Sequence, residues 1–461
     1  MTYVFTKYGE VYAGALWNEM HLDNYTIVIQ FSKIQEYREL PHNEKTIEKI
    51  SEYGWVIAND AVHGTIEGEN FDPQGTHTQG DSLYGGYDRK VMFVFGAGAS
   101  ANCVYGGDKE EFNQDVLRPP LGASLFDKRF KNHYSRYKGV KQSLTFLQGD
   151  NPDVEEMFEQ EWKNISKENN EAVMKRHINI QYYLQEVLRD VTQKVTEDYF
   201  AKNLYARLAN QLQKIHAASV KNVHGNHSCK KFAFVSFNQD TILDTFLTEQ
   251  FNQPIAAMDD YVNINEKPFC LFKPHGSWDW GWQFPNTSQF GGKTADWLFD
   301  NKKSFFNLYF ELLGNHIDMV DWASWGHEAS LNKHHLGRYT TDKSQLKIIG
   351  NDNLNNYYPA LLLPYRDKDE FTMPLKHFYN MQYYFSHVET LILIGWKGNE
   401  DAFNRQLLSH AHGIRKVIIA DPNHKIVEKN LKELLSKPNI EKVFYKNFED
   451  FVENGIEKEI K

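Results

Sequence analysis

The feature that most constrains the fold of this chain is a series of short apolar runs that alternate with helical patterns. The runs occupy residues 90–98, 231–238, 269–273, 359–364, 390–395 and 416–421. Apolar residues at helical spacing occur between or beside them, at 153–220, 402–413 and 425–436. Strands that are apolar on both faces and alternate with helices are typical of a parallel sheet. We therefore predict an α/β fold, with a Rossmann-like parallel sheet and helices on both faces.

Composition excludes several classes of protein. The net charge of -10 disfavours a general nucleic-acid binder, which needs a basic surface. We find no uncharged apolar run of the length, about 18 residues, that a membrane span needs, and the first residues lack the layout of a signal peptide. The three cysteines lie too far apart for a disulfide framework or a paired zinc motif. We expect a cytoplasmic protein with reduced thiols, no metal and no membrane partner.

The chain divides into an N-terminal extension, residues 1–88, and a main domain, residues 89–461. The extension holds β-prone stretches at 25–31 and 53–60, and it ends in a segment rich in turn residues. Within the main domain we expect a mainly helical small lobe at about 130–225 and an aromatic insertion at about 281–357. Interfaces are enriched in aromatic residues, so the extension and the insertion are candidates for assembly or partner contacts. The alternative, that both only cover the core, stays open.

The run "KVMFVFGAGASANC" (90–103) ends in glycine, alanine and serine. Two interpretations are open. Gly96 and Gly98 could form a tight structural turn, or they could let a pyrophosphate approach backbone N–H groups, as in dinucleotide-binding turns. The pattern is not a phosphate-binding P-loop, because no Gly-Lys-Ser/Thr follows. It also departs from the dehydrogenase fingerprint, because Ala101 occupies the third glycine position.

Two further strand ends carry polar side chains. In "VSFNQDTILD" (235–244), Asn238 and Asp240 follow an apolar run, where α/β sheets place their ligand sites. Taken alone, Asp240 is more simply interpreted as the cap of the helix that follows. In "LFKPHGSWDWGW" (271–282), His275 lies between proline and glycine after a short strand, a suitable position for acid–base chemistry. The alternative is one surface histidine among 19.

In this order, the glycine turn, Asn-x-Asp and His-Gly resemble the sirtuin superfamily, specifically the divergent sirtuin-like domains of bacterial antiphage defence. The resemblance covers roughly residues 90–425. It implies that the glycine turn binds the pyrophosphate of NAD, that Asn238 and Asp240 lie beside the nicotinamide ribose, and that His275 is the catalytic base. The turn residues with this implied role are Gly96, Ala97, Gly98 and Ser100.

The resemblance extends to three other segments. "RPPLGASLF" (118–126), with Pro120, resembles the loop that closes over the nicotinamide end. "ILIGWKGNEDAF" (392–403) and "VIIADPN" (417–423) resemble segments beside the adenosine half. They contribute Gly395, Trp396, Asp421 and Asn423 as implied cofactor-binding residues. Deacylating sirtuins also carry a four-cysteine zinc module and a Pro-Asp-Phe-Arg run, and both are missing here.

The departures disfavour deacylation of acyl-lysine and leave cleavage of NAD itself as the expected activity. NAD would be a substrate, and the products would be nicotinamide and ADP-ribose. Constant loss of NAD would harm a cell, so we expect an enzyme that is inactive until a regulatory partner or a change of homo-oligomeric assembly activates it, as in antiphage defence. The alternatives are an NAD-dependent deacylase or ADP-ribosyltransferase, and a non-catalytic sensor of NAD or ADP-ribose.

Overall fold

The computed structural model describes short strands between residues 4 and 71 and a larger body built from part of residues 88–460. The segments of this body are 88–134, 171–221, 229–263, 267–283, 336–338, 357–362, 372–410 and 412–460. Its centre is a six-stranded sheet in which every neighbouring pair is parallel. The strands are β7 (Asp88–Phe95), β8 (Lys230–Ser236), β9 (Phe269–Phe272), β13 (Thr390–Ile394), β14 (Lys416–Ala420) and β15 (Glu441–Tyr445). The expected Rossmann-like α/β fold is confirmed.

The order of the strands places a switch point at the centre of this sheet. Across the sheet the order is β9-β8-β7-β13-β14-β15. In chain order this is 3-2-1-4-5-6, the arrangement of dinucleotide-binding sheets. The chain moves outward in opposite directions from β7 and β13, so the connections at their carboxyl ends diverge. Ligands of open α/β sheets bind at such a point.

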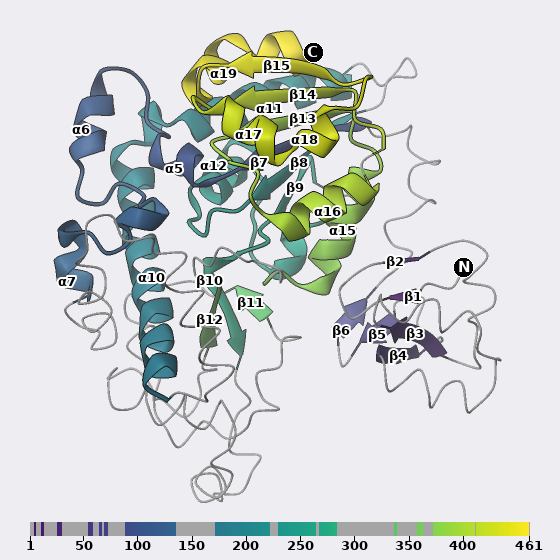
Figure 1. Cartoon of the computed structure of the whole chain (residues 1–461), viewed down its shortest axis with the longest axis horizontal. Coiled ribbons are helices and arrows are strands. Elements are labelled where there is room, and N and C mark those ends of the chain that lie inside the picture. Colours follow the sequence, from purple (N-terminus) through teal and green to yellow (C-terminus); the bar gives the residue numbers. More distant parts are fainter. Residues whose placement is uncertain are drawn as a thin grey trace, which may run out of the picture.

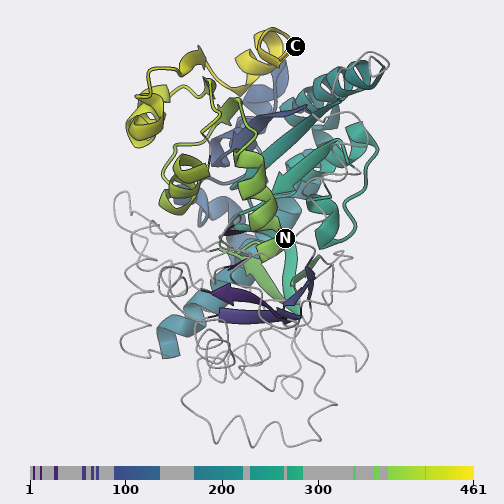
Figure 2. The same cartoon turned by 90° about the vertical axis from the view of Figure 1, so that its right-hand side faces the viewer.

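Helices cover both faces of the sheet. In Figure 1, α15 (Leu375–Phe385), α16 (Asp401–His410) and α17 (His424–Asn430) lie in front of the strands, and α11 (Leu204–Lys221) and α12 (Ile242–Phe251) lie behind; Figure 2 shows the two groups on opposite sides. Strands β8, β9, β13 and β14 are buried along most of their length, because side chains on both faces meet helices. Phe93, for example, stacks on Phe234 with the ring centroids 5.1 Å apart.

The expected helical segment at 153–220 contains two long helices in its described part. These are α10 (Glu171–Asp198) and α11. Their regular apolar spacing buries one face of each, through residues such as Val187, Val191, Leu208 and Leu212. Although we expected a small lobe at about 130–225, α11 packs against β8 and α12 and so covers the sheet. Residues 135–170 lie outside the described part of the chain.

A second, smaller sheet lies next to the end of β9. In it β10 (Gly276–Gln283) pairs antiparallel with β11 (Leu336–Arg338) on one side and with β12 (Tyr357–Leu361) on the other. The apolar run at 359–364 was expected to join the parallel sheet, and this expectation is wrong. Its first residues pair with β10, the tryptophan-rich strand that follows His275. Because β10 lies outside the parallel sheet, its backbone N–H and C=O groups need these other partners.

The N-terminal extension, residues 1–88, forms a sheet of its own. The β-prone stretches of the extension form β3 (Tyr25–Ile29) and β4 (Gly54–Ala58). With β1 (Val4–Phe5) and β2 (Val11–Tyr12) they make a four-stranded sheet of order β2-β1-β3-β4. Most of the insertion at 281–357 lies outside the described residues. The assembly role expected for the insertion and for residues 1–88 stays a prediction. None of the helices that the structure describes is long and apolar enough to cross a membrane.

Candidate functional site

The glycine turn and Gly395 meet at the switch point. The turn leads from β7 into the short helix α5 (Ala97–Ala101), and Gly395 follows β13 directly. The N–H of Gly96 donates to the carbonyl of Ile394 at 3.1 Å, and that of Gly98 donates to the carbonyl of Gly395 at 3.1 Å. Two strand ends that are distant in sequence are therefore joined through their backbones.

The glycines allow this close approach. A Cβ atom at Gly96 would lie 2.5 Å from the Gly395 oxygen, and one at Gly98 would lie 3.0 Å from the same oxygen. Gly395 has φ of +57°, and its own Cβ would lie 2.2 Å from the nitrogen of Ala99. The structural interpretation of the turn is thus supported by direct contacts. Of the turn residues, Ala97 is exposed, Gly98 is half-buried and Ser100 is buried, so the accessible side-chain surface of the turn lies at Ala97.

We predict that Gly98→Val destabilises the protein by about 1–3 kcal/mol, because the larger side chain would press on the backbone of Gly395. The matched control is Gly106→Val, which adds the same side chain at a glycine where nothing lies within 4 Å of the new Cβ, although its φ of +76° carries a strain of its own of roughly 1–2 kcal/mol. Urea denaturation measures both effects. If Gly98→Val unfolds as easily as the wild type, the contact with Gly395 does not restrict residue 98.

Asn238 connects the end of β8 to the glycine turn. Its Nδ2 donates to the Gly96 carbonyl at 3.0 Å and to Ser100 Oγ at 2.8 Å. The hydroxyl of Tyr205 lies 3.1 Å from Ser100 Oγ, and burial raises the pKa of this tyrosine well above its usual value. A buried hydrogen-bond network therefore holds the Asn238 amide against the turn.

Asp240 contacts both the start of α12 and the glycine turn. Its Oδ1 accepts from the N–H of Ile242, the first residue of α12, at 3.1 Å, so it satisfies a helix terminus. The carboxyl is also buried beside the Ser100 hydroxyl. Burial raises its pKa, and the charge of Lys273 and the bond from Ser100 limit the rise.

His275 lies on a turn that backbone bonds hold on several sides. The N–H of Gly276 donates to the Lys273 carbonyl at 3.0 Å, and the His275 carbonyl accepts from the N–H of Leu362 at 2.9 Å. The same carbonyl accepts from Gln239 Nε2 at 3.1 Å. Gln239 also donates to the carbonyl of Leu362. The residue between Asn238 and Asp240 thus ties the β8 loop to the His275 turn.

Aromatic side chains join His275 to the switch point. The imidazole packs against Phe237, with the ring centroids 4.9 Å apart, and Phe237 stacks on Trp396 at 5.4 Å with an interplanar angle of 8°. The Trp396 indole N–H donates to Glu400. His275 is 5% exposed and Trp396 is 2% exposed, so both rings are packed rather than presented to solvent. Admission of a substrate to His275 would require this packing to open.

The other residues expected to bind the cofactor lie in the 118–126 segment and after β14. The segment at 118–126 reaches the end of α5, because Arg118 Nε donates to the Ala101 carbonyl at 2.7 Å; Pro120 beside it is half-buried. Asp421 follows β14, the neighbour of β13, and its pKa is raised by burial. Its Oδ1 accepts from the N–H of the exposed Asn423 at 2.6 Å.

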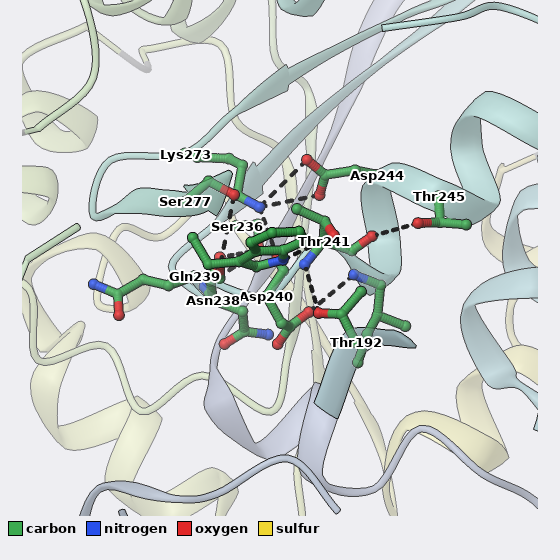
Figure 3. Close-up of polar contacts among 12 residues, drawn as sticks. Thr192, Ser236, Asn238, Gln239, Asp240, Thr241, Asp244, Thr245, Lys273 and Ser277 are labelled. Atoms are coloured by element: carbon green, nitrogen blue, oxygen red, sulfur yellow. Dashed lines mark hydrogen bonds and ion pairs between the residues drawn. The ribbon is translucent and has the colours of Figure 1, made fainter. Parts of the chain in front are cut away.

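Sequence reasoning missed Lys273 and Asp244. Lys273 Nζ donates to the Asp240 carbonyl at 2.6 Å and lies 3.1 Å from Asp244 Oδ2, as Figure 3 shows. The side chains of Lys273 and Asp244 are 0% and 1% exposed. A lysine directly after the apolar run of β9 was a signal in the sequence, but its partner on α12 could be found only in the fold.

Neither a scan against protein-family models nor a search of curated proteins finds a match to this chain. Within the described residues, no group of three or more histidine, cysteine, aspartate or glutamate side chains is arranged to hold a metal ion.

Proposed function

We propose that this protein is an NAD hydrolase that cleaves the bond between nicotinamide and ribose. The observation that carries the proposal is the hydrogen bonding of Asn238 to both Gly96 and Ser100, at the switch point of a sheet with dinucleotide-binding strand order. The His275 turn lies beside it, bonded to the next residue of the same loop. Support also comes from the order of these motifs, which resembles that of sirtuin-like domains.

The reaction asks little of the protein beyond positioning and one base. The C1′–N1 bond breaks, and its electron pair goes to the nicotinamide nitrogen, which becomes neutral and needs no acid. The ribose carbon passes through an oxocarbenium-like state, as in glycoside hydrolysis. A water oxygen forms the new bond to C1′, and its proton goes to His275 as general base. The products are nicotinamide, ADP-ribose and a proton.

The other residues bind and orient the substrate in this scheme. The exposed face of the glycine turn, at Ala97, contacts the pyrophosphate, and Asn238 orients the ribose or the water. Asp240 holds the Asn238 loop through α12 and Ser100. Asp421 and the segment at Gly395 lie at the ends of neighbouring strands, where the adenosine half would bind.

The packed position of His275 fits an enzyme that is inactive at rest. Phe237 packs against the imidazole and itself stacks on Trp396, and a regulatory partner or a change in homo-oligomeric assembly would act by releasing this packing. We propose antiphage defence in the cytoplasm as its setting, on the ground of the sirtuin-like resemblance.

The test incubates the purified full chain with NAD, alone and together with the products of its neighbouring genes, and follows nicotinamide and ADP-ribose by chromatography. We expect both products in equal amounts under activating conditions. ADP-ribose attached to protein would instead identify a transferase. Binding of NAD without any product, under every condition tried, would contradict the proposal and identify a sensor.

A further inference from the structure

The ion pair between Lys273 and Asp244 lies at the junction of two loops of the candidate site. Lys273 is the first residue after β9, and Asp244 belongs to the first turn of α12. The Lys273 ammonium lies 3.3 Å and 3.1 Å from the two Asp244 oxygens, and it donates to the Asp240 carbonyl at 2.6 Å. Three acceptors surround one ammonium, which has three protons to donate.

Burial of this pair carries a cost that needs an explanation. Removing two charges from water is expensive, and a buried pair often adds little to stability compared with apolar side chains of similar size. Here Asp244 also accepts from the Tyr261 hydroxyl at 2.9 Å, and Trp280 Nε1 donates to that hydroxyl at 3.2 Å. The carboxylate is thus held from two elements, which keeps the ammonium in one place.

The hydrogen bond from Lys273 to the Asp240 carbonyl links the ion pair to the candidate site. Asp240 lies in the loop that carries Asn238, and Lys273 lies two residues before His275. The ammonium therefore joins the β8 loop to the start of the His275 turn, and Gln239 joins the same loop to the end of that turn. Figure 3 shows Lys273 pointing toward Asp244 while the Gln239 side chain extends to the opposite side.

We propose that Lys273 is a positioning residue: its ammonium, neutralised by Asp244, fixes the Asp240 peptide and so holds Asn238 in register with His275. The kinetic part of this inference rests on the proposed NAD-hydrolase function, whereas the structural part does not. Lys273 touches neither substrate nor water in this scheme. It acts through the backbone of the loop.

The test compares two double variants. Lys273→Met with Asp244→Asn removes both charges together, so no buried charge is left unpaired, and the introduced asparagine keeps an oxygen for Tyr261. The control is Lys267→Met with Asp260→Asn. Lys267 makes the same kind of contacts at the other end of β9, with the Pro254 carbonyl at 2.6 Å and Asp260 Oδ1 at 3.0 Å.

Hydrogen exchange of peptides covering residues 237–241 is the first measurement. We expect exchange about ten- to hundredfold faster in the first double variant, the factor typical of losing one hydrogen bond from a charged donor, and unchanged exchange there in the control. The second measurement is NAD cleavage under activating conditions. We expect kcat to fall by a similar factor with KM changed less than about threefold, because contacts with the rest of NAD remain.

The outcomes separate the two proposals. Unchanged exchange at 237–241 overturns the positioning role, and so does faster exchange with unchanged kcat. If the wild-type protein cleaves no NAD, the proposed function fails, and loop exchange alone then decides whether Lys273 fixes the loop. If the double variant does not fold, Lys273→Arg is used, because its planar guanidinium keeps the charge but cannot reproduce the position of the ammonium. It should show the same changes to a smaller degree, and wild-type exchange in it overturns the proposal.

Discussion

His275→Ala is expected to lower NAD cleavage by about 10²–10⁴-fold under activating conditions, the range that general-base catalysis contributes. NAD affinity should change little, because the pyrophosphate and adenosine contacts of the scheme involve other strand ends. The imidazole packs against Phe237, so some loss of stability is also expected from the space it leaves. Product chromatography gives the rate, and calorimetry with NAD gives the affinity.

The matched control for this variant is His216→Ala. Like His275, His216 packs against a phenylalanine ring, that of Phe251, and its Nδ1 is bonded to the Lys230 carbonyl at 2.7 Å. It lies near the start of β8, at the opposite edge of the sheet from the candidate site. Its removal should leave cleavage per folded molecule unchanged. Near wild-type turnover in His275→Ala would show that His275 is not the base.

Gly276→Ala is expected to be the most destabilising single substitution in the site, at about 2–5 kcal/mol. Two costs add. Gly276 has φ of +76°, a conformation that costs an L-residue roughly 1–2 kcal/mol. A Cβ there would also lie 1.9 Å from the Ala360 oxygen, so β10 and β12 would have to separate, with an overpacking cost of about 1–3 kcal/mol.

Gly106→Ala isolates the first of these costs. Gly106 has the same φ of +76°, but nothing lies within 4 Å of the Cβ that alanine would add. Denaturant unfolding of the two variants should therefore show a larger loss for Gly276→Ala, and the difference measures the contact with β12. Equal losses would mean that the strands can separate at no cost and that the His275 turn is not restrained by them.

The parallel sheet was predictable from sequence because strands buried on both faces must be apolar throughout. The runs at 90–98, 231–238, 390–395 and 416–421 therefore stand out without any knowledge of their neighbours. The edge strand β15 did not stand out, because three of its five residues are exposed and two of them are charged. The run at 359–364 has the composition of an inner strand but pairs with β10, and pairing partners cannot be read from one run alone.

In the candidate site, too, some features follow from the sequence and others only from the tertiary structure. The sequence by itself determined which residue types follow the strand ends: glycines at 96 and 98, Asn238, Asp240 and His275. The tertiary structure alone decided that the glycines make room for Gly395, that Asn238 is bonded to their turn, and that Lys273 joins Asp240 to Asp244. The physical reason is that local residue type limits backbone conformation and burial, whereas a contact depends on which strand ends the topology brings together.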